Sequence, residues 1–418
     1  MKDKKVCVIG KGYVGLPLAY NFARQGFETY GFDICPKKIV ECKYGLDRTQ
    51  EVGDKINEVG IIFTNEEEVI GLCDYVIVAV PTPTINGAPE LKYLKGATEI
   101  IGRNLKADTI VVYESTVYPF CTQKFCLPIL KANTDLIYDQ DYFIGFSPER
   151  VNPGDRENKV TNITKIVAGN NISITDELAR LYEYITPNIH KVNDIVVAES
   201  AKILENSQRD VNIALVNQFA MLHPDIPTKE VIDAMNTKWN ALGFTPGLVG
   251  GHCIAEDPNY LTGQCIEFGK RFSILEESRN INESVAGYVV SNICDYFKTR
   301  DLNGIRVLIK GITFKANIND VRNSKAYDLY RYLNSLEATV NIDDPVADSV
   351  ELKKLYDIEL GVINDMSEYD VVIYTVGHDI FVNDLEDLII HDGKLLLYDI
   401  PSLFYQEDLS EEITYKCL

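Results

Sequence analysis

The sequence predicts an α/β protein in which two doubly wound, Rossmann-like domains are joined by a long central helix and a helical region around it. Three observations support this fold class. Apolar, β-branched runs alternate with helical segments in the first third of the chain, a long middle stretch lacks glycine and proline, and alternation returns in the last third. Strands separated by helices imply parallel β-α-β units. We expect domains at residues 1–193, 194–298 and 299–418.

The first domain opens with an apolar strand over residues 5–9, followed by a helix over 16–25 and a second strand over 29–33. Later runs rich in Val, Ile, Tyr and Phe are typical of buried strands. They are residues 74–80, which Pro81 ends, 109–113 and 142–146.

The middle of the chain is helical. Between residues 194 and 222, apolar side chains recur at three- and four-residue steps, which indicates one long helix that Pro224 ends. A helix of this length commonly forms a connector or an oligomer interface, and a further helix is expected over 276–298. The recurring apolar residues are Val197, Ala201, Leu204, Val211 and Leu215.

The last third echoes the first. It contains predicted strands at 306–310, 339–342 and 370–376 and a helix at 327–336. The run DVVIYTV at 370–376 resembles DYVIVAV at 74–80, and DDP at 343–345 resembles DICP at 33–36. We interpret this as a second Rossmann-like domain without a complete glycine fingerprint; convergent strand composition is the alternative.

The composition restricts the function classes. The 418 residues carry a formal net charge of −21, which argues against general binding of nucleic acid or anionic membranes, because both attract basic surfaces. No apolar run has the length of a membrane span, and the one after the basic N-terminus is too short for a signal peptide. The ten cysteines form no Cys-x-x-Cys pair and the five histidines show no metal-ligand spacing. We therefore expect reduced thiols, a cytoplasmic location and no metal site.

A glycine-rich turn follows the first strand. Gly10, Gly12 and Gly15 fit G-x-G-x-x-G, in which the glycines permit a tight turn, approach of a pyrophosphate and close packing of helix on strand. The helix N-terminus then faces the phosphates. Asp33, at the end of the next strand, is placed to bond ribose hydroxyls and to repel a 2′-phosphate. The segment predicts a nucleotide site that takes NAD.

A second segment, Gly250-Gly251-His252-Cys253, places a cysteine after two glycines, and Asp257 follows four residues later. Glycine lets backbone approach a ligand, and a thiolate forms covalent intermediates with carbonyl carbons. A carbonyl-trapping thiol in a chain with a site for a hydride acceptor suggests oxidation beyond an aldehyde. A metal pair of His252 and Cys253 is the alternative.

The central helix has a polar face. Glu199, Lys202, Asn206 and Arg209 follow one another at steps of three, four and three residues, so they share one side, opposite an apolar side. We expect a solvated stripe; Lys202 and Asn206 lining a cleft between domains is the alternative.

Other polar or aromatic residues allow two interpretations each. Glu149, after an apolar strand, is expected to form a loop salt bridge, with a general base as the alternative. Lys315, Asp320 and Arg322 either hold an anion or form a surface charge cluster. Trp239, the single tryptophan, is expected to pack in a core rather than to stack on a base.

Taken together, these motifs resemble the UDP-glucose/GDP-mannose dehydrogenase family over nearly the whole chain, and several motifs in one order are far more specific than one. They are residues 10–15, 80–83, 114–116, 147–149, 201–206, 250–253 with 257, and 311–315 with 320 and 322. Segments 149–154, 237–240 and 246–253 look closest to the branch that oxidises UDP-N-acetylhexosamines, and within it to the Vi-antigen type of UDP-N-acetylglucosamine 6-dehydrogenase.

The resemblance implies a four-electron oxidation at C6 of a UDP-N-acetylhexosamine, for surface polysaccharide synthesis. The aldehyde from the first oxidation would add to Cys253 as a thiohemiacetal, and the second oxidation would leave a thioester for water to cleave. It also implies a homodimer formed through the central helix, a UDP-sugar partner, and no binding of nucleic acid or insertion into a membrane.

The resemblance also implies the site residues. Lys202 and Asn206 would stabilise developing oxygen charge, Asp257 and Thr116 would hold or polarise water, and Glu149 would act as base. The implied catalytic residues are Cys253, Lys202, Asn206, Asp257, Glu149 and Thr116. The implied cofactor residues are Gly10, Gly12, Tyr13, Val14, Gly15, Asp33, Lys38, Pro81, Thr82, Ser115, Thr116 and Arg322. The implied substrate residues are Glu149, Arg150, Val151, Lys202, Asn206, Arg209, Gly250 and Lys315.

The chain departs from the family pattern at five positions: Thr245 where close relatives tend to carry arginine, Glu256 for an apolar residue, Asn259 for a frequent aromatic, and Phe120-Cys121 for small residues. We expect Glu256 to point to solvent; if it points inward instead, it would raise the pKa of the thiol or repel a phosphate. The competing functions are 6-dehydrogenation of UDP-glucose or UDP-N-acetylmannosamine, a two-electron alcohol dehydrogenase, and a nucleotide-sugar-binding protein without turnover.

Overall fold

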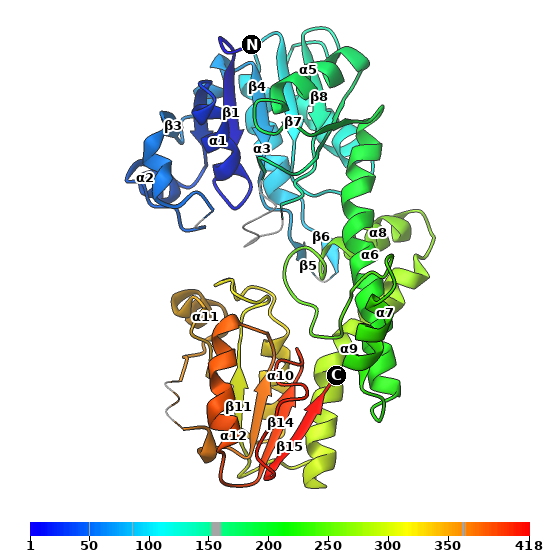
Figure 1. The fold of residues 1–418 in the computed structure, drawn as a ribbon. Helices are drawn as coiled ribbons and strands as arrows, with labels where there is room; N and C mark the ends of the chain where they lie inside the picture. Colours follow the sequence, from blue (N-terminus) through cyan, green and yellow to red (C-terminus); the bar gives the residue numbers. More distant parts are fainter. Residues whose placement is uncertain (50, 86, 152–159, 362, 364) are drawn as a thin grey trace. The chain divides into compact units, whose positions relative to one another are not determined.

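The computed structural model describes residues 1–49, 51–85, 87–151, 160–361, 363 and 365–418 (Figure 1). The chain divides into two compact units. The first comprises Met1–Glu205 with Asn259–Lys270, and the second comprises Asn206–Pro258 with Arg271–Leu418. Each unit contains a sheet with helices, so the predicted α/β class is confirmed.

The first unit is built on a sheet with the strand order β10-β9-β8-β7-β4-β1-β2-β3. From β3 to β8 this is the 3-2-1-4-5-6 order of dinucleotide-binding folds, whose ligands lie at the carboxyl ends of the strands. All its strand pairs are parallel except β8 with β9. The strands are β1 (Lys5–Ile9), β2 (Glu28–Phe32), β3 (Ile61–Thr64), β4 (Tyr75–Val78), β7 (Thr109–Tyr113), β8 (Tyr142–Phe146), β9 (Lys165–Gly169) and β10 (Ile189–Lys191).

Five of these strands are predicted by the sequence, whereas β3, β9 and β10 are not. The missed strands are short or begin or end with lysine, which weakens the apolar signal. Strand β2 ends at Phe32, so Asp33 lies in the loop after the strand and not at its end.

Helices pack on both faces of this sheet and form one hydrophobic core on each face. Alternate residues of β1 point to opposite faces: Val6 packs in the cluster of Phe22 from α1, and Cys7 packs in the cluster of Ile101 from α3. The helices are α1 (Gly15–Arg24), α2 (Pro36–Lys43), α3 (Lys92–Asn104), α4 (Leu127–Ala132) and α5 (Ile172–Tyr182), and a short hairpin joins β5 (Thr84–Ile85) to β6 (Ala88–Pro89).

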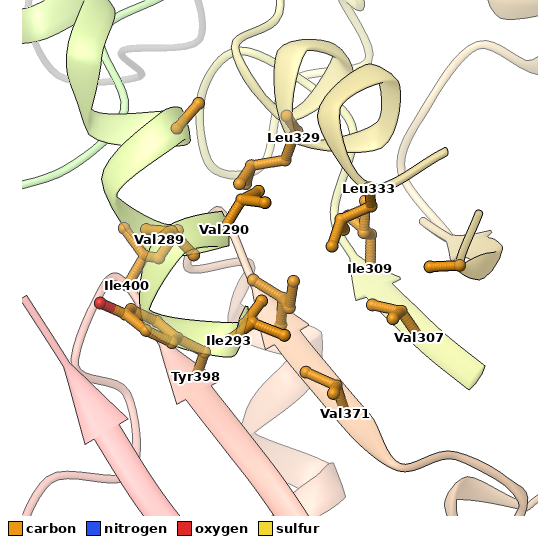
Figure 2. Close-up of a cluster of buried hydrophobic side chains, with 14 of the residues drawn as sticks. Val289, Val290, Ile293, Val307, Ile309, Leu329, Leu333, Val371, Tyr398 and Ile400 are labelled. Atoms are coloured by element: carbon orange, nitrogen blue, oxygen red, sulfur yellow. The ribbon is translucent and has the colours of Figure 1, made fainter. Parts of the chain in front are cut away.

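The second unit contains a five-stranded parallel sheet in the order β12-β11-β13-β14-β15. This is the other common doubly wound order, 2-1-3-4-5. One face is covered by α9 and α10, where Ile293, Leu329 and Val307 meet in a buried cluster (Figure 2). The elements are β11 (Arg306–Lys310), β12 (Thr339–Asp343), β13 (Val371–Tyr374), β14 (Leu395–Asp399), β15 (Ile413–Cys417), α9 (Ser273–Phe297), α10 (Ala326–Ser335), α11 (Ser349–Tyr356) and α12 (Leu385–Ile389). The predicted second Rossmann-like domain is confirmed.

Helix α6 (Ile195–Leu222) is 28 residues long and confirms the predicted long helix. The prediction that the polar face of this helix is exposed to solvent is wrong. Lys202 and Asn206 are 9% and 4% exposed, whereas Leu204 and Leu215 are 56% and 66% exposed. In the first unit Glu199 bonds to the loop at Phe120, and in the second unit Asn206 bonds to Asp257 at the start of α8 (Asp257–Glu267). Among the described residues, no helix is long and apolar enough to cross a membrane.

Trp239 is 92% exposed, so its predicted core packing is wrong. It lies between α7 (Thr228–Asn236) and α8 (Asp257–Glu267), in a segment without a helix or strand. Such a segment has no regular face that packs against a core.

Candidate active site

The glycine fingerprint connects β1 to α1. Gly10 has a φ of +92°, and a Cβ there would lie 2.3 Å from the Ala79 carbonyl oxygen. A Cβ on Gly15 would lie 2.0 Å from the Gly10 carbonyl oxygen, so the helix packs directly on the turn. At Gly12, by contrast, no heavy atom of the described chain lies within 4 Å of the Cβ position. The backbone at Gly12 is therefore open to a phosphate.

Asp33 ties this turn to the loop after β2. Its carboxylate accepts hydrogen bonds from the N–H groups of Lys11 (3.0 Å) and Cys35 (2.9 Å), and Lys38 Nζ lies 3.7 Å from Oδ2. The Lys11 side chain turns inward to the Val8 carbonyl oxygen, and burial lowers the pKa of Lys11 to about 8. Asp33 thus stands beside the turn, where a ribose-binding acid is needed.

Two loops at the same edge of the sheet bond to each other. The Val80 N–H donates to Ser115 Oγ (3.0 Å), and the Ser115 hydroxyl donates to the Val80 carbonyl oxygen (2.8 Å). The Thr82 hydroxyl donates to the Thr116 carbonyl oxygen (2.7 Å), and the Tyr260 hydroxyl donates to the Thr82 carbonyl oxygen. The predicted cofactor residues in these loops are Pro81, Thr82, Ser115 and Thr116.

Glu149 lies near a buried ion pair. Lys165 Nζ is 2.5 Å from Glu114 Oε2 and 4.0 Å from Glu149 Oε2. The Tyr182 hydroxyl donates to the other oxygen of Glu114. Burial raises the pKa of Glu114, and the charge of Lys165 opposes that shift. Glu149 faces a cation and its side chain is 13% exposed, so the geometry is compatible with both the loop ion pair and the general base.

The residues after Glu149 bond within the first unit. The Val151 N–H donates to Glu149 Oε1, and Arg150 Nη2 pairs with Glu205 Oε2 at 3.0 Å. Residues 152–154, part of the segment that indicated the hexosamine branch, lie outside the described residues.

Glu199 of α6 orders the loop that follows Thr116. Its carboxylate accepts hydrogen bonds from the N–H groups of Phe120 (2.6 Å) and Thr122 (2.8 Å), and Phe120 has a φ of +72°. Burial raises the pKa of Glu199 to about 7, although the two N–H groups oppose this shift. This buried carboxylate holds the backbone at the Phe120-Cys121 departure.

We expect Glu199 to make stability fall as the pH rises towards 7. Its folded pKa of about 7 lies above its ordinary 4.5, so the folded state binds more protons between these values. The stability that this group contributes is present below the unfolded pKa and is lost as pH passes the folded pKa. Glu199→Gln removes the titration. We compare the free energy of unfolding in urea of Glu199→Gln with that of wild type at pH 5.5 and at pH 8. The difference, variant minus wild type, should be more positive at pH 8 by on the order of 1–3 kcal/mol. The same difference at both pH values would contradict a raised pKa for the buried Glu199 carboxyl group.

In the second unit, Asn206 and Asp257 meet at the start of α8. Asn206 Nδ2 donates to Asp257 Oδ2 at 2.5 Å, and both side chains are buried. The Asp257 N–H donates to the Cys253 carbonyl oxygen (2.9 Å). Cys253 is exposed, whereas the other nine cysteines are buried or partly buried. Three predicted catalytic residues therefore form one hydrogen-bonded group.

The glycines before Cys253 pack against the second Rossmann-like domain. A Cβ on Gly250 would lie 2.6 Å from the Asn323 carbonyl oxygen. A Cβ on Gly251 would lie 2.5 Å from the Phe314 ring, and Gly251 has a φ of +79°. Side chains larger than hydrogen do not fit at either position.

His252 is neutral near pH 7. Burial and, to a smaller extent, the charge of Arg322 lower its pKa to about 4, although the charge of Asp320 opposes them. Arg322 itself forms a two-point pair with Asp320, with Nε 2.9 Å from Oδ1 and Nη2 2.5 Å from Oδ2. His252 therefore does not supply the cation that would favour a thiolate at Cys253.

The turn after β11 is held by buried polar groups. Asp344 accepts hydrogen bonds from the N–H groups of Ile312 and Thr313, as Asp33 does at the first fingerprint. His378 Nδ1 accepts from the Asn317 N–H (2.9 Å), and its Nε2 lies 3.1 Å from Thr313 Oγ. This network fixes the backbone on both sides of Lys315, whose side chain is partly exposed.

The first unit fits NAD. The open backbone of Gly12 and the N-terminus of α1 suit a pyrophosphate, and Asp33 suits a ribose. Arg322, also assigned to the cofactor by resemblance, lies in the second unit. In the part of the chain that the structure describes, no cluster of His, Cys, Asp or Glu is arranged to hold a metal ion. The residues of the first unit that would hold NAD are Gly10, Gly12, Tyr13, Val14, Gly15, Asp33, Lys38, Pro81, Thr82, Ser115 and Thr116.

The predicted catalytic residues divide between the units. Thr116, Glu149 and Lys202 belong to the first, and Asn206, Cys253 and Asp257 belong to the second. Sequence reasoning assigned no role to Lys165, His378 or Asn323, and it placed Glu199 in a solvated stripe. A histidine that closely follows a strand is a signal that could have identified His378, whereas the strand that Lys165 opens was itself not predicted. Asn323 has no such signal.

Three family models match successive parts of the chain. They describe the NAD binding domain (residues 4–186), the central domain (196–284) and the UDP binding domain (308–402) of the UDP-glucose/GDP-mannose dehydrogenase family.

Relatives match over nearly their full length. The chain is 41% identical over 421 residues to the UDP-N-acetyl-D-glucosamine 6-dehydrogenase of Pseudomonas aeruginosa, covering 98% of this chain and 99% of that protein. It is 41% identical over 388 residues to the enzyme of the same name from Salmonella typhi, covering 91% of each. The solved structure of the UDP-D-ManNAc dehydrogenase of Pyrococcus horikoshii is similar with a TM-score of 0.87 and 25% identity, covering 99% of this chain and 98% of that one.

Proposed function

Because the chain belongs to the UDP-glucose/GDP-mannose dehydrogenase family, we propose that it oxidises C6 of UDP-N-acetyl-D-glucosamine to the uronic acid with NAD. The observation that carries the chemistry is the exposed Cys253, bonded through its backbone to the buried Asn206–Asp257 pair. The identity of 41% to two enzymes of that name supports the choice of sugar.

The proposed mechanism has two oxidations at one carbon. First, the C6 hydroxyl loses its proton and C6 loses a hydride, which produces an aldehyde. NAD, when bound, would accept one hydride in each oxidation, so two molecules of NAD would be reduced per sugar. The Cys253 thiolate then forms a carbon–sulfur bond to the aldehyde carbon, and the resulting thiohemiacetal keeps one C–H bond for the second oxidation. Loss of that hydride and of the hydroxyl proton leaves a thioester.

The other proposed catalytic residues act on the oxygen and on water. The Lys202 ammonium and the Asn206 amide stabilise negative charge on the C6 oxygen. Asp257 and Thr116 hold the water, and Glu149 takes its proton as the water attacks the thioester. Cleavage of the carbon–sulfur bond releases the acid and returns the thiol.

The test is a panel of UDP-sugars assayed for NADH and for product mass. We expect UDP-N-acetyl-D-glucosamine to be oxidised fastest and to yield two NADH per molecule of acid. Turnover of UDP-glucose alone, or faster turnover of UDP-N-acetylmannosamine, would overturn the sugar assignment. One NADH per sugar would indicate a two-electron alcohol dehydrogenase, and binding without NADH would indicate a nucleotide-sugar-binding protein.

We also propose a homodimer formed through α6. Residues that are exposed or partly exposed recur along this helix at alternating steps of four and three, the 3.5-residue period of paired helices. They are Leu204, Gln208, Val211, Leu215, Gln218 and Leu222. We call this row of six residues the seam. Its Leu215 and Leu222 are 66% and 67% exposed, so the seam is suited to burial against a second copy of the chain.

Leu215→Glu should convert the dimer to monomer, because it places a charge in the centre of this seam. Light scattering after size-exclusion chromatography measures the mass. Leu355→Glu, at a leucine 45% exposed on α11, is the matched control and should remain dimeric. A wild-type monomer would contradict the proposal.

Three further expectations are part of the proposal. The domain limits are 1–193, 194–298 and 299–418, the location is cytoplasmic because a reactive thiol needs a reducing compartment, and the uronic acid serves surface polysaccharide synthesis.

A further inference from the structure

The loop that carries Cys253 is joined to the second Rossmann-like domain by two opposed hydrogen bonds. The Gly251 N–H donates to the Asn323 carbonyl oxygen at 3.1 Å. The Asn323 side-chain amide Nδ2 donates to the Gly251 carbonyl oxygen at 2.8 Å. The backbone and the side chain of one residue therefore bracket Gly251, two residues before the thiol.

Steric contacts leave this loop little freedom. The Cβ position of Gly250 faces the Asn323 carbonyl oxygen at 2.6 Å, and that of Gly251 faces the Phe314 ring at 2.5 Å. Since both glycines lie directly against the turn, the hydrogen bonds do not lengthen without moving the loop. The position of Cys253 therefore depends on this contact.

Asparagine suits this position for two reasons. Asn323 has a φ of +51°, in the left-handed region that glycine, asparagine and aspartate tolerate better than other residues. Its side chain also supplies an N–H donor to the Gly251 carbonyl oxygen. Glycine adopts the left-handed backbone but has no side-chain donor. Aspartate has nearly the same size and shape as asparagine, but its ionised carboxylate only accepts hydrogen bonds.

The segment that contains Asn323 also carries Lys315, assigned to the UDP-sugar by resemblance, and Arg322, assigned to the cofactor. Lys315 and Arg322 lie on the same segment, 311–325, within the UDP-binding domain match. A small pocket is formed jointly by the cysteine loop and this segment. It is lined among others by Leu248, Gly250, Thr313, Phe314, Ser324 and Lys325.

We propose that Asn323 is a positioning residue for Cys253, because it holds the cysteine loop against the UDP-binding segment so that one structural element places both the nucleotide and the thiol. The inference deepens the proposed function and rests on it for the role of the thiol. Asn323 acts through Gly251 and not on the substrate.

Three variants of the full-length enzyme test the proposal. Asn323→Asp replaces the donor with an acceptor that repels the Gly251 carbonyl oxygen. Asn323→Gly keeps the left-handed backbone and the carbonyl acceptor but removes the amide. Asn319→Asp is the matched control, because it makes the same chemical change at an exposed residue of the same segment.

We expect Asn323→Asp to lower kcat for acid formation by on the order of 10–100-fold, because small displacements of a reacting group have large effects on rate. The KM for the UDP-sugar should change less than about threefold, since the substrate contacts remain. Hydrogen–deuterium exchange in the peptide around Gly251 should become faster, and Cys253 should be alkylated by iodoacetamide at a changed rate. Asn323→Gly should lie between Asn323→Asp and wild type, and Asn319→Asp should match wild type.

Wild-type exchange, alkylation and kcat in Asn323→Asp would overturn the proposal, and so would faster exchange with unchanged alkylation and kcat. A rise in KM alone would also overturn it, because it would assign Asn323 to substrate binding. Exchange and alkylation need no turnover. If the wild-type enzyme oxidises no UDP-sugar, the proposed function fails while these two measurements still decide whether Asn323 places the thiol.

Discussion

Cys253→Ser should abolish formation of the uronic acid and leave nucleotide binding intact. The thiolate is the reactive form of cysteine, and serine at the same position remains a neutral hydroxyl near pH 7. The side chain at 253 is exposed, serine is close to cysteine in size, and the carbonyl oxygen of residue 253 still accepts from the Asp257 N–H. We expect the rate of acid formation to fall by about 10³-fold or more, as for loss of other catalytic nucleophiles.

The measurement is mass detection of the acid, with binding of UDP followed by calorimetry. Cys265→Ser is the matched control, since this cysteine lies on α8 and is only partly buried. It should retain wild-type activity. Acid released by Cys253→Ser at the wild-type rate would exclude the covalent route and leave direct hydration of the aldehyde.

Asn206→Asp should lower kcat by on the order of 10²–10³-fold, the cost of removing a donor to a developing oxyanion. The variant places a carboxylate against Asp257, where the Nδ2–Oδ2 hydrogen bond of 2.5 Å now stands. Two carboxylates in a buried site do not both ionise readily, so one pKa rises. The variant therefore loses the amide donor of Asn206. The new carboxyl group is either ionised, which adds a negative charge to the site, or protonated, with a protonation state that depends on pH.

Steady-state rates between pH 6 and 9 test this prediction, because the damage should grow as the carboxylate pair ionises. Asn212→Asp on the same helix is the matched control, since its amide is bonded to the Gln208 carbonyl oxygen and is partly exposed. A kcat for Asn206→Asp within threefold of wild type would remove Asn206 from the oxyanion site.

Much of the fold was predictable because its signals are local. The alternation of apolar runs with helices predicts five strands of the first sheet and three of the second, and the segment without glycine or proline predicts α6. Strands β3, β9 and β10 escape prediction because a few residues flanked by charge do not define a period. Lys165, at the start of β9, is a partner of Glu114, 51 residues away, and no local pattern indicates such a pair.

The helix α6 shows the limit of a periodic signal. Spacing places Glu199, Lys202 and Asn206 on one side of the helix, but it does not say which side the rest of the chain covers. The usual preference of charge for water predicts a solvated stripe, yet these three side chains are buried. Glu199 is covered by the loop at Phe120, and Asn206 by Asp257.

The sequence by itself determined the family of this protein and predicted its chemistry. The glycine turn, the acid after the second strand and the thiol before Asp257 are short motifs whose meaning depends on neighbours in the chain. Only the tertiary structure decided which polar groups are buried and what holds the thiol loop. The bond between Asn323 and Gly251 joins residues 72 positions apart, and such contacts are set by the packing of whole elements and not by spacing along the chain.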